Sequence, residues 1–288
     1  MNNENVLRRR LRRGQKSRIV TTAILIPIVI IWLLPLLWGL ATSFKTDTDI
    51  DAHLLSLIPR DFTLERYIRL FENSDLYPVL RWLFNSVYIA AAYTVLHLLV
   101  VSLAAYAFSV LEFKGRNVLF TAVLSTMMIP GVINLVPMYN MMVRFNWVGS
   151  PLALIVPGVA GVSGLFIMRQ FFMNIPKSLV ESAQLEGAGH FSIFFRIVLP
   201  LSSSALMVTG LFGFLANWND YMWPQIILGA ERVTSMTLTV GLSQMQGSYN
   251  YDLGLTMTAA ILSAVPVLLL FLVTQEKVIE GIAHTGLK

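Results

Sequence analysis

The sequence lacks cysteine altogether and contains few charged residues. Of its 288 residues none is cysteine, 13% are Asp, Glu, Lys or Arg, and 56% are hydrophobic. The absence of cysteine excludes disulfides and thiolate metal sites. Soluble domains carry about 25% charged residues, so this chain has too little charge to cover a water-exposed surface. Together with a mean hydropathy of +0.67, this excludes an ordinary soluble enzyme and predicts an all-α integral membrane protein.

Six long stretches contain no Asp, Glu, Lys or Arg. They are 23 to 30 residues long, and a helix needs about 20 residues to cross a hydrocarbon core of about 30 Å. We therefore predict six transmembrane helices within Ile19–Phe44, Trp82–Leu111, Asn117–Val143, Phe145–Met168, Ile197–Asn219 and Leu253–Gln275. In a further uncharged run, Val233–Tyr251, nine of 19 residues are Ser, Thr, Gln or Asn. This run is predicted to be an extracytoplasmic loop.

The positive charges indicate the orientation of the chain. The first eighteen residues hold seven Lys and Arg, opposed only by Glu4. If the N-terminus lies inside, fourteen of the 21 Lys and Arg are cytoplasmic, in line with the positive-inside rule. A cleavable signal peptide is disfavoured because its apolar core spans about 7–15 residues and the first run has 26. Both termini are predicted to be cytoplasmic. No basic soluble domain follows the tail, so nucleic acid is not expected as a partner.

The larger outer loop, residues 45–81, contains an amphipathic segment. Within Thr63–Glu72, the side chains of Leu64, Tyr67, Ile68 and Phe71 share one face of a helix with a period of 3.6 residues. A short helix on the outer surface is therefore predicted.

Several kinds of site are missing from the sequence. A phosphate-binding loop needs lysine directly after its second glycine, and the nearest run, Gly281–Lys288, has leucine there. The four histidines show no metal-ligand spacing, and His97 is interpreted as a packing residue. The glycines of Gly158–Gly164 are interpreted as helix-packing positions inside an apolar helix. The predicted helix cores also lack the charged residues that ion-coupled transporters use, so energy for uphill transport would have to come from another chain.

The longest internal loop, residues 169–196, has the pattern of a helix–turn–helix. Pro176 suits the first position of a helix, and Gly187 and Gly189 suit its end, where a left-handed conformation is common. A second amphipathic helix is predicted over Phe191–Leu199. A short charged helix pair between two membrane helices is suited to docking a soluble partner.

This loop resembles the EAA motif of permeases from binding-protein-dependent ATP-binding cassette (ABC) importers. Eight residues match the motif at its spacing: Glu181, Ala183, Gly187, Ala188, Phe194, Ile197, Leu199 and Pro200. Ser182 and Glu186 replace the usual Ala and Asp. Three further segments resemble the carbohydrate-uptake branch, and within it the smaller, maltose-permease-type partner: Leu57–Tyr67, Asn217–Pro224 and Glu280–Lys288.

The resemblance implies an ABC type I importer permease fold with six membrane helices in a bacterial or archaeal cell membrane. Residues 1–81 would form the basic tail, first helix and outer loop, and residues 276–288 a cytoplasmic tail. Residues 82–275 would form a five-helix core with its coupling loop at 169–200. The implied partners are a second homologous permease, two ATP-binding subunits, an extracytoplasmic sugar-binding protein and membrane lipid. ATP and Mg would bind the partner ATPase, and this chain would hold no cofactor, metal or catalytic residue.

The resemblance also assigns residues to roles. The ATPase-coupling residues would be Glu181, Ser182, Ala183, Glu186, Gly187 and Ala188. From their chemistry, Trp218, Asn219 and Asp220 are candidates for the solute path, with an interfacial anchor as the alternative. Tyr249, Asn250 and Tyr251 are candidates for contacting the binding protein. The sugar stays open, and so does a permease for glycerol-3-phosphate or another polyol. An ion-coupled transporter or a membrane enzyme is disfavoured.

Overall fold

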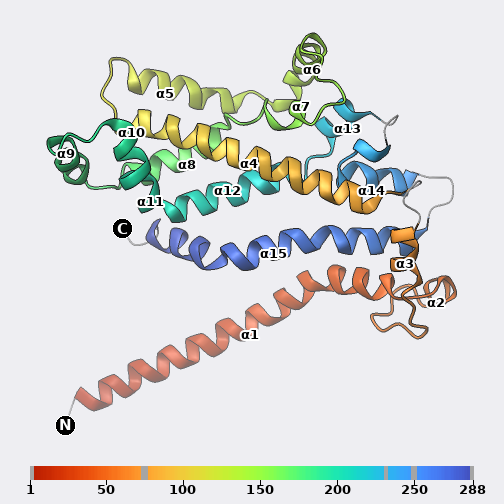
Figure 1. Cartoon of the computed structure of the whole chain (residues 1–288). Coiled ribbons are helices and arrows are strands. Elements are labelled where there is room, and N and C mark those ends of the chain that lie inside the picture. The colour runs from red at the N-terminus through yellow and green to blue at the C-terminus, as the bar shows by residue number, and fades with distance from the viewer. Residues whose placement is uncertain (1–2, 73–76, 230–232, 248–251, 286–288) are drawn as a thin grey trace. The chain divides into compact units, whose positions relative to one another are not determined.

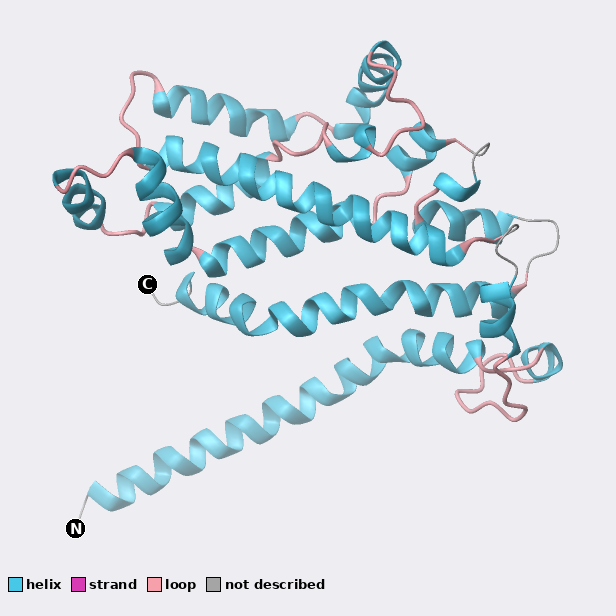
Figure 2. Cartoon of the chain, in the orientation of Figure 1, coloured by secondary structure: helices cyan, strands magenta, loops and turns pink. Residues whose placement is uncertain are grey.

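The computed structural model describes residues 3–72, 77–229, 233–247 and 252–285. Helices and loops make up these residues, and Figure 2 shows no strand among them. The nearest approach to a strand is an isolated antiparallel bridge between Lys45 and Phe62. The prediction of an all-helical chain is therefore confirmed for the described residues.

Three helices in the described part of the chain are long and apolar enough to cross a membrane. They are α1 (Asn3–Ser43), with its candidate span at Thr21–Ser43, α4 (Val79–Ser109) and α15 (Leu253–Thr285), with its candidate span at Leu253–Lys277. These helices coincide with the first, second and sixth predicted spans.

The third and fifth predicted spans are each broken by a sharp bend. Helices α5 (Arg116–Ser125) and η1 (Thr126–Met128) meet η2 (Gly131–Asn134) and α6 (Leu135–Arg144) at an angle of 93°. Pro130 stands at this break and holds Ile129 extended (ψ 118°), because proline disfavours the helical conformation in the residue before it. The second bend, of 81°, separates His190–Leu201 from α12 (Ser203–Trp218). Counting each bent pair as one span gives up to five among the described residues, and the sixth stays a prediction.

The fourth predicted span is divided where glycines were expected to lie inside a helix. Helix α7 (Leu152–Ile155) ends before Gly158, and Gly161 caps the start of α8 (Val162–Phe172). The prediction of one continuous helix here is wrong, although the packing role of the glycines is confirmed. A Cβ on Gly161 would lie 2.9 Å from the ring of His97, and one on Gly164 would lie 2.5 Å from it. The imidazole of His97, which bonds Val159 O through Nδ1 at 2.9 Å, fills the space that the glycines leave.

The chain divides into two compact units. The larger comprises residues 73–249 and 263–288. In it, α4, α8 and α12 lie side by side (Figure 1) and have the most extensive mutual contacts. Helices α9 (Lys177–Leu185) and α10 (His190–Ile193) lie at one end of α4, and α13 (Met222–Leu228) and α14 (Leu238–Gly247) lie at the other (Figure 1).

The segment predicted to be a polar outer loop contains a buried helix. Among residues 233–247, η4 (Val233–Ser235) is followed by α14, whose Leu238, Val240 and Met245 are buried. The run is therefore partly helical and not an irregular loop, and apolar side chains of its helix are buried. Its many polar residues interrupt the apolar ones, so no continuous apolar stretch marks the helix in the sequence.

The smaller unit comprises residues 1–72 and 250–262 and contains α2 (Asp47–Ala52) and α3 (Glu65–Glu72). The predicted surface helix is confirmed as α3, but its buried face is different. Arg66 and Leu70 are buried, whereas Ile68 and Phe71 are about half exposed. The guanidinium of Arg66 donates to Thr42 O at 3.2 Å and pairs with Asp47, so two strong contacts compensate the burial of its charge.

Candidate coupling loop and solute path

Helix α9 has a defined beginning and end. Pro176 precedes it in an extended conformation (ψ 125°). At its end, Ala188 N donates to Ala183 O and Gly187 N to Gln184 O, both at 2.9 Å. With Gly187 at φ +83°, this is a Schellman motif, in which a left-handed residue lets the chain satisfy the last helical carbonyls. The predicted role of Gly187 as a helix terminator is therefore confirmed.

Helix α9 has one buried face and one exposed face. Ala183 is buried and joins a cluster that includes Phe172, Ile193 and Phe194. The side chains of the other face stand in solvent: Glu181, Ser182, Glu186 and Leu185, the last 90% exposed. The exposed face of α9 and its turn thus presents two carboxylates, a hydroxyl and one apolar side chain, all accessible to a partner.

Two further residues attach this loop region to the helix bundle. The hydroxyl of Tyr106 in α4 hydrogen-bonds Nδ1 of His190, the first residue of α10, at 3.2 Å. Arg169 in α8 donates from Nε to Phe108 O at 3.1 Å, and its guanidinium carbon lies 4.0 Å from the ring centroid of Phe120 in α5. The sequence analysis missed both contacts. Arg169 could have been noticed as the first charged residue after an uncharged run of 24 residues.

Between the loop and α12, the chain changes its hydrogen-bond register. Residues Phe194–Val198 form a π-helix, and Pro200 follows within α11 (Leu199–Leu201). Proline cannot donate its main-chain nitrogen to the preceding turn, and single π-turns accommodate such interruptions. Since Phe194 and Val198 are buried in the same cluster as Ala183, the coupling loop and the start of α12 share one core.

The candidate solute-path residues differ in exposure. Trp218 is only 6% exposed, and its ring stacks on Phe214 with centroids 5.6 Å apart. Asn219 is exposed and Asp220 half-buried. Burial raises the pKa of Asp220 above its ordinary value, although N–H groups including that of Trp223 lower it in part. The binding-protein candidates Tyr249, Asn250 and Tyr251 lie outside the described residues.

Side chains on either side of Trp218–Asp220 donate hydrogen bonds to main-chain carbonyls of α7. Asn217 Nδ2 donates to Leu154 O at 3.3 Å, and Trp223 Nε1 donates to Ala153 O at 2.9 Å. The last carbonyls of a helix have no partner within that helix. Side chains from α12 and α13 therefore supply partners for the end of α7.

The N-terminal end of α4 is hydrogen-bonded to residues 233–238, which lead into α14. Trp82 is fully buried, and a Cβ on Gly241 would lie 2.2 Å from its ring. Several hydrogen bonds join the two: Trp82 Nε1 donates to Val233 O (2.6 Å), Asn85 Nδ2 to Thr234 O (3.0 Å) and Met236 O (2.9 Å), and Leu238 N to Ser86 Oγ (2.8 Å). Helix α4 thus contacts α14 at one end and α10 at the other.

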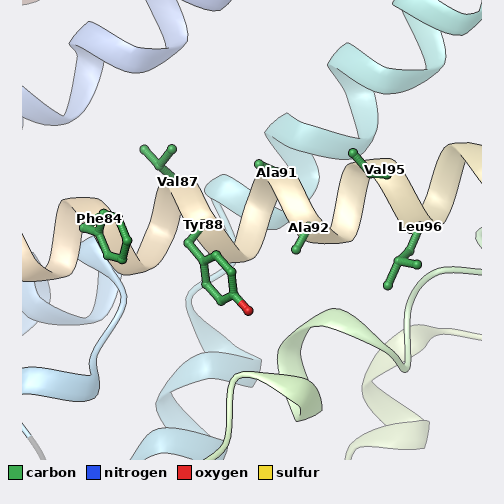
Figure 3. Close-up of a pocket in the computed structure, with 7 residues that line it drawn as sticks. All are labelled: Phe84, Val87, Tyr88, Ala91, Ala92, Val95 and Leu96. Atoms are coloured by element: carbon green, nitrogen blue, oxygen red, sulfur yellow. The ribbon is translucent and has the colours of Figure 1, made fainter.

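A shallow hollow of about 550 Å³ lies along α4. Figure 3 shows Tyr88, Ala92 and Leu96 pointing to one side, with Val87 and Val95 pointing to the other. Its lining is almost wholly apolar, and a sugar site needs convergent polar groups. The hollow is therefore suited to contact with an apolar surface and not to binding a sugar. The described residues also contain no cluster of three or more possible metal ligands.

The long apolar helices and the bent helix pairs are those of an integral membrane protein whose helices are broken at prolines and glycines. The chain belongs to the family of binding-protein-dependent transport system inner membrane components, whose model matches residues 99–278. It is accordingly a permease subunit of an ABC transporter and not an enzyme. This confirms the family that the EAA motif indicated.

Relatives of this chain are similar over nearly their whole length. The arabinooligosaccharides transport system permease protein AraQ of Halalkalibacterium halodurans is 32% identical, covering 91% of this chain and 93% of that one. The trehalose/maltose transport system permease protein MalG of Thermococcus litoralis is also 32% identical, covering 96% and 99%. A chain of a bacterial ABC transporter involved in the import of the acidic polysaccharide alginate has the same fold, with a TM-score of 0.81 at 20% identity over 92% of this chain and 97% of that one.

Proposed function

We propose that this chain forms half of the membrane pathway of an ATP-driven importer for oligosaccharides or disaccharides. Family membership supports the permease role, and the names of its relatives, which transport arabinooligosaccharides and trehalose or maltose, support the sugar class. A second permease would complete the pathway, an extracytoplasmic binding protein would deliver the sugar, and two ATP-binding subunits would hold ATP and Mg.

The coupling role is assigned to α9 and the turn that follows it. The observation that carries it is the division of α9 into a buried Ala183 and an exposed face with Leu185. The exposed face would dock on a cytoplasmic ATPase subunit. Because the buried face shares its core with the start of α12, a displacement of α9 would move α12 with it.

Substitutions at Gly187 test this role. Nothing lies within 4 Å of a Cβ built there, so a side chain would meet no clash and would cost only the left-handed backbone, about 1–2 kcal/mol. Gly187→Val should reduce sugar-stimulated ATP hydrolysis and uptake in proteoliposomes. Gly187→Asn, whose side chain tolerates that conformation, should retain most of both.

The outcome separates the coupling role from an unrelated defect. The Gly187→Val subunit should still insert and assemble, since its core residues are unchanged, and basal ATP hydrolysis should persist. Normal sugar uptake by the valine variant would contradict the assigned role. Equal loss in the asparagine variant would show that backbone conformation is not the cause.

The solute path is assigned to the end of α12, where Asn219 presents an exposed amide. Asn219→Ala should raise the sugar concentration needed for half-maximal uptake, because an amide offers hydrogen bonds to sugar hydroxyls. Asn217→Ala is a matched control, since that amide is occupied by Leu154 O and its loss should lower thermal stability instead. Parental uptake by the Asn219→Ala variant would remove this residue from the path.

A further inference from the structure

Residues 53–58, here called loop 53–58, expose an unusual amount of apolar surface. Leu55 is 83% exposed and Ile58 75%, and Leu54 and Leu57 are each more than 40% exposed. No Asp, Glu, Lys or Arg occurs between Asp51 and Arg60. Clustered exposed leucines of this kind mark a contact surface for an apolar partner.

Four main-chain carbonyls of loop 53–58 accept hydrogen bonds from side chains of the same unit. Lys45 is fully buried, and its Nζ donates to His53 O at 2.7 Å and to Ser56 O at 2.8 Å. Trp38 Nε1 donates to Leu54 O at 2.7 Å. The hydroxyl of Ser56 donates to Ile58 O at 2.9 Å. An irregular segment can enter a lipid environment only when its main-chain polar groups are satisfied within the protein, and these contacts meet that requirement for four carbonyls.

The contact with Trp38 also fixes the level of the loop along α1. Trp38 lies within the membrane-crossing part of α1, five residues before its end at Ser43, which is about 8 Å along the helix axis. Since the Trp38 side chain reaches Leu54 O, the loop folds back beside the crossing helix rather than away from it.

Hydrogen bonds to a buried carboxylate hold the base of the loop together. The carboxylate of Asp49 is buried and accepts Arg60 N at 2.8 Å and Asp61 N at 3.4 Å. Asp51 and Arg60, which flank the uncharged run, are exposed. The loop is therefore held in one shape before it meets any partner, with charges at its base and leucines at its tip.

From these contacts we propose that loop 53–58 inserts into the bilayer leaflet at the C-terminal end of α1. There it anchors the smaller unit to lipid. The partner is the acyl-chain region just below the lipid headgroups. Amphipathic helices at the interface insert their apolar face to a depth of about 5–10 Å in that region. The alternatives, a second protein subunit or water around the loop, give different outcomes in the test below.

Site-directed spin labelling of the assembled transporter in lipid nanodiscs tests the proposal. The chain has no cysteine, so Leu55→Cys and Ile58→Cys each provide one labelling site once accessible cysteines of the other subunits are replaced. In the lipid, a nitroxide collides often with dissolved oxygen and rarely with a water-soluble nickel chelate. The ratio of the collision rate with oxygen to that with the nickel chelate should be several-fold higher at both positions than in the control Asp51→Cys.

Each other result would overturn the proposal. Low collision rates with both reagents at Leu55→Cys and Ile58→Cys would show that a protein subunit covers the loop. A ratio equal to that of the Asp51→Cys control would show a loop in water. In Ile58→Cys combined with Lys45→Met, the ratio should fall, because the carbonyls of His53 and Ser56 lose their partner. An unchanged ratio there would overturn the role of Lys45.

Discussion

Asp49 shows how a single buried carboxylate organises the smaller unit. Burial by itself would raise its pKa, but the N–H groups of Arg60 and Asp61 and the ring of His53 stabilise the charged form, so its pKa lies below the ordinary value. A lowered pKa means that the ionised carboxylate stabilises the folded loop at pH values above the unfolded pKa of about 3.9. This contribution is lost as the pH falls through the folded pKa.

Hydrogen exchange of the Arg60 and Asp61 amides can test this role. Both amides should be protected at pH 6, and their protection factors, corrected for intrinsic rates, should fall below about pH 4 as Asp49 takes up a proton. Asp49→Ala should abolish the protection at pH 6. Asp51→Ala is the control, because Asp51 is exposed and its loss should leave protection unchanged. Full protection in the Asp49→Ala variant would contradict this account.

At the scale of the element, α4 and α14 show packing that only a glycine permits. Gly241 lies against the fully buried ring of Trp82. Gly247, at the other end of α14, has nothing within 4 Å of a built Cβ. The same substitution should therefore destabilise the fold at Gly241 and not at Gly247.

Gly241→Ala should destabilise the fold by about 1–3 kcal/mol, the usual cost of forcing a methyl group into a packed core. Gly247→Ala should leave stability almost unchanged, because Gly247 is the last residue of α14 and an added Cβ meets nothing within 4 Å. Thermal unfolding of the purified transporter measures both. If the two variants unfold at the same temperature, the contact between α14 and Trp82 does not contribute to stability.

For the whole molecule, the distribution of charge predicts the orientation in the membrane. In the predicted topology, fourteen of the 21 Lys and Arg fall in the N-terminal tail, the two inner loops and the C-terminal tail, so these segments should face the cytoplasm. A cysteine at Ser182 should be protected from an impermeant thiol reagent in intact cells, and one at Asp51 should react. Both residues are exposed in the fold, so burial does not explain a difference. The opposite labelling pattern would reverse the orientation.

The sequence by itself determined the membrane character, the three long apolar helices and the helix with its turn at residues 177–189. Each depends on local patterns: long runs without charge, and a glycine that must adopt a left-handed turn at position 187. These features need no knowledge of distant residues, since the bilayer sets the length and the backbone sets the turn.

Only the tertiary structure decided where the other helices break and which of their faces are buried. The helix α14 was hidden in a polar run because its burial depends on Trp82, which is 159 residues before Gly241 in the sequence. Lys45 was counted as a charge of the outer loop, yet it is buried because carbonyls up to eleven residues away surround its amine. Such positions depend on partners that only the tertiary fold brings together, and the spacing of apolar and charged residues does not encode them.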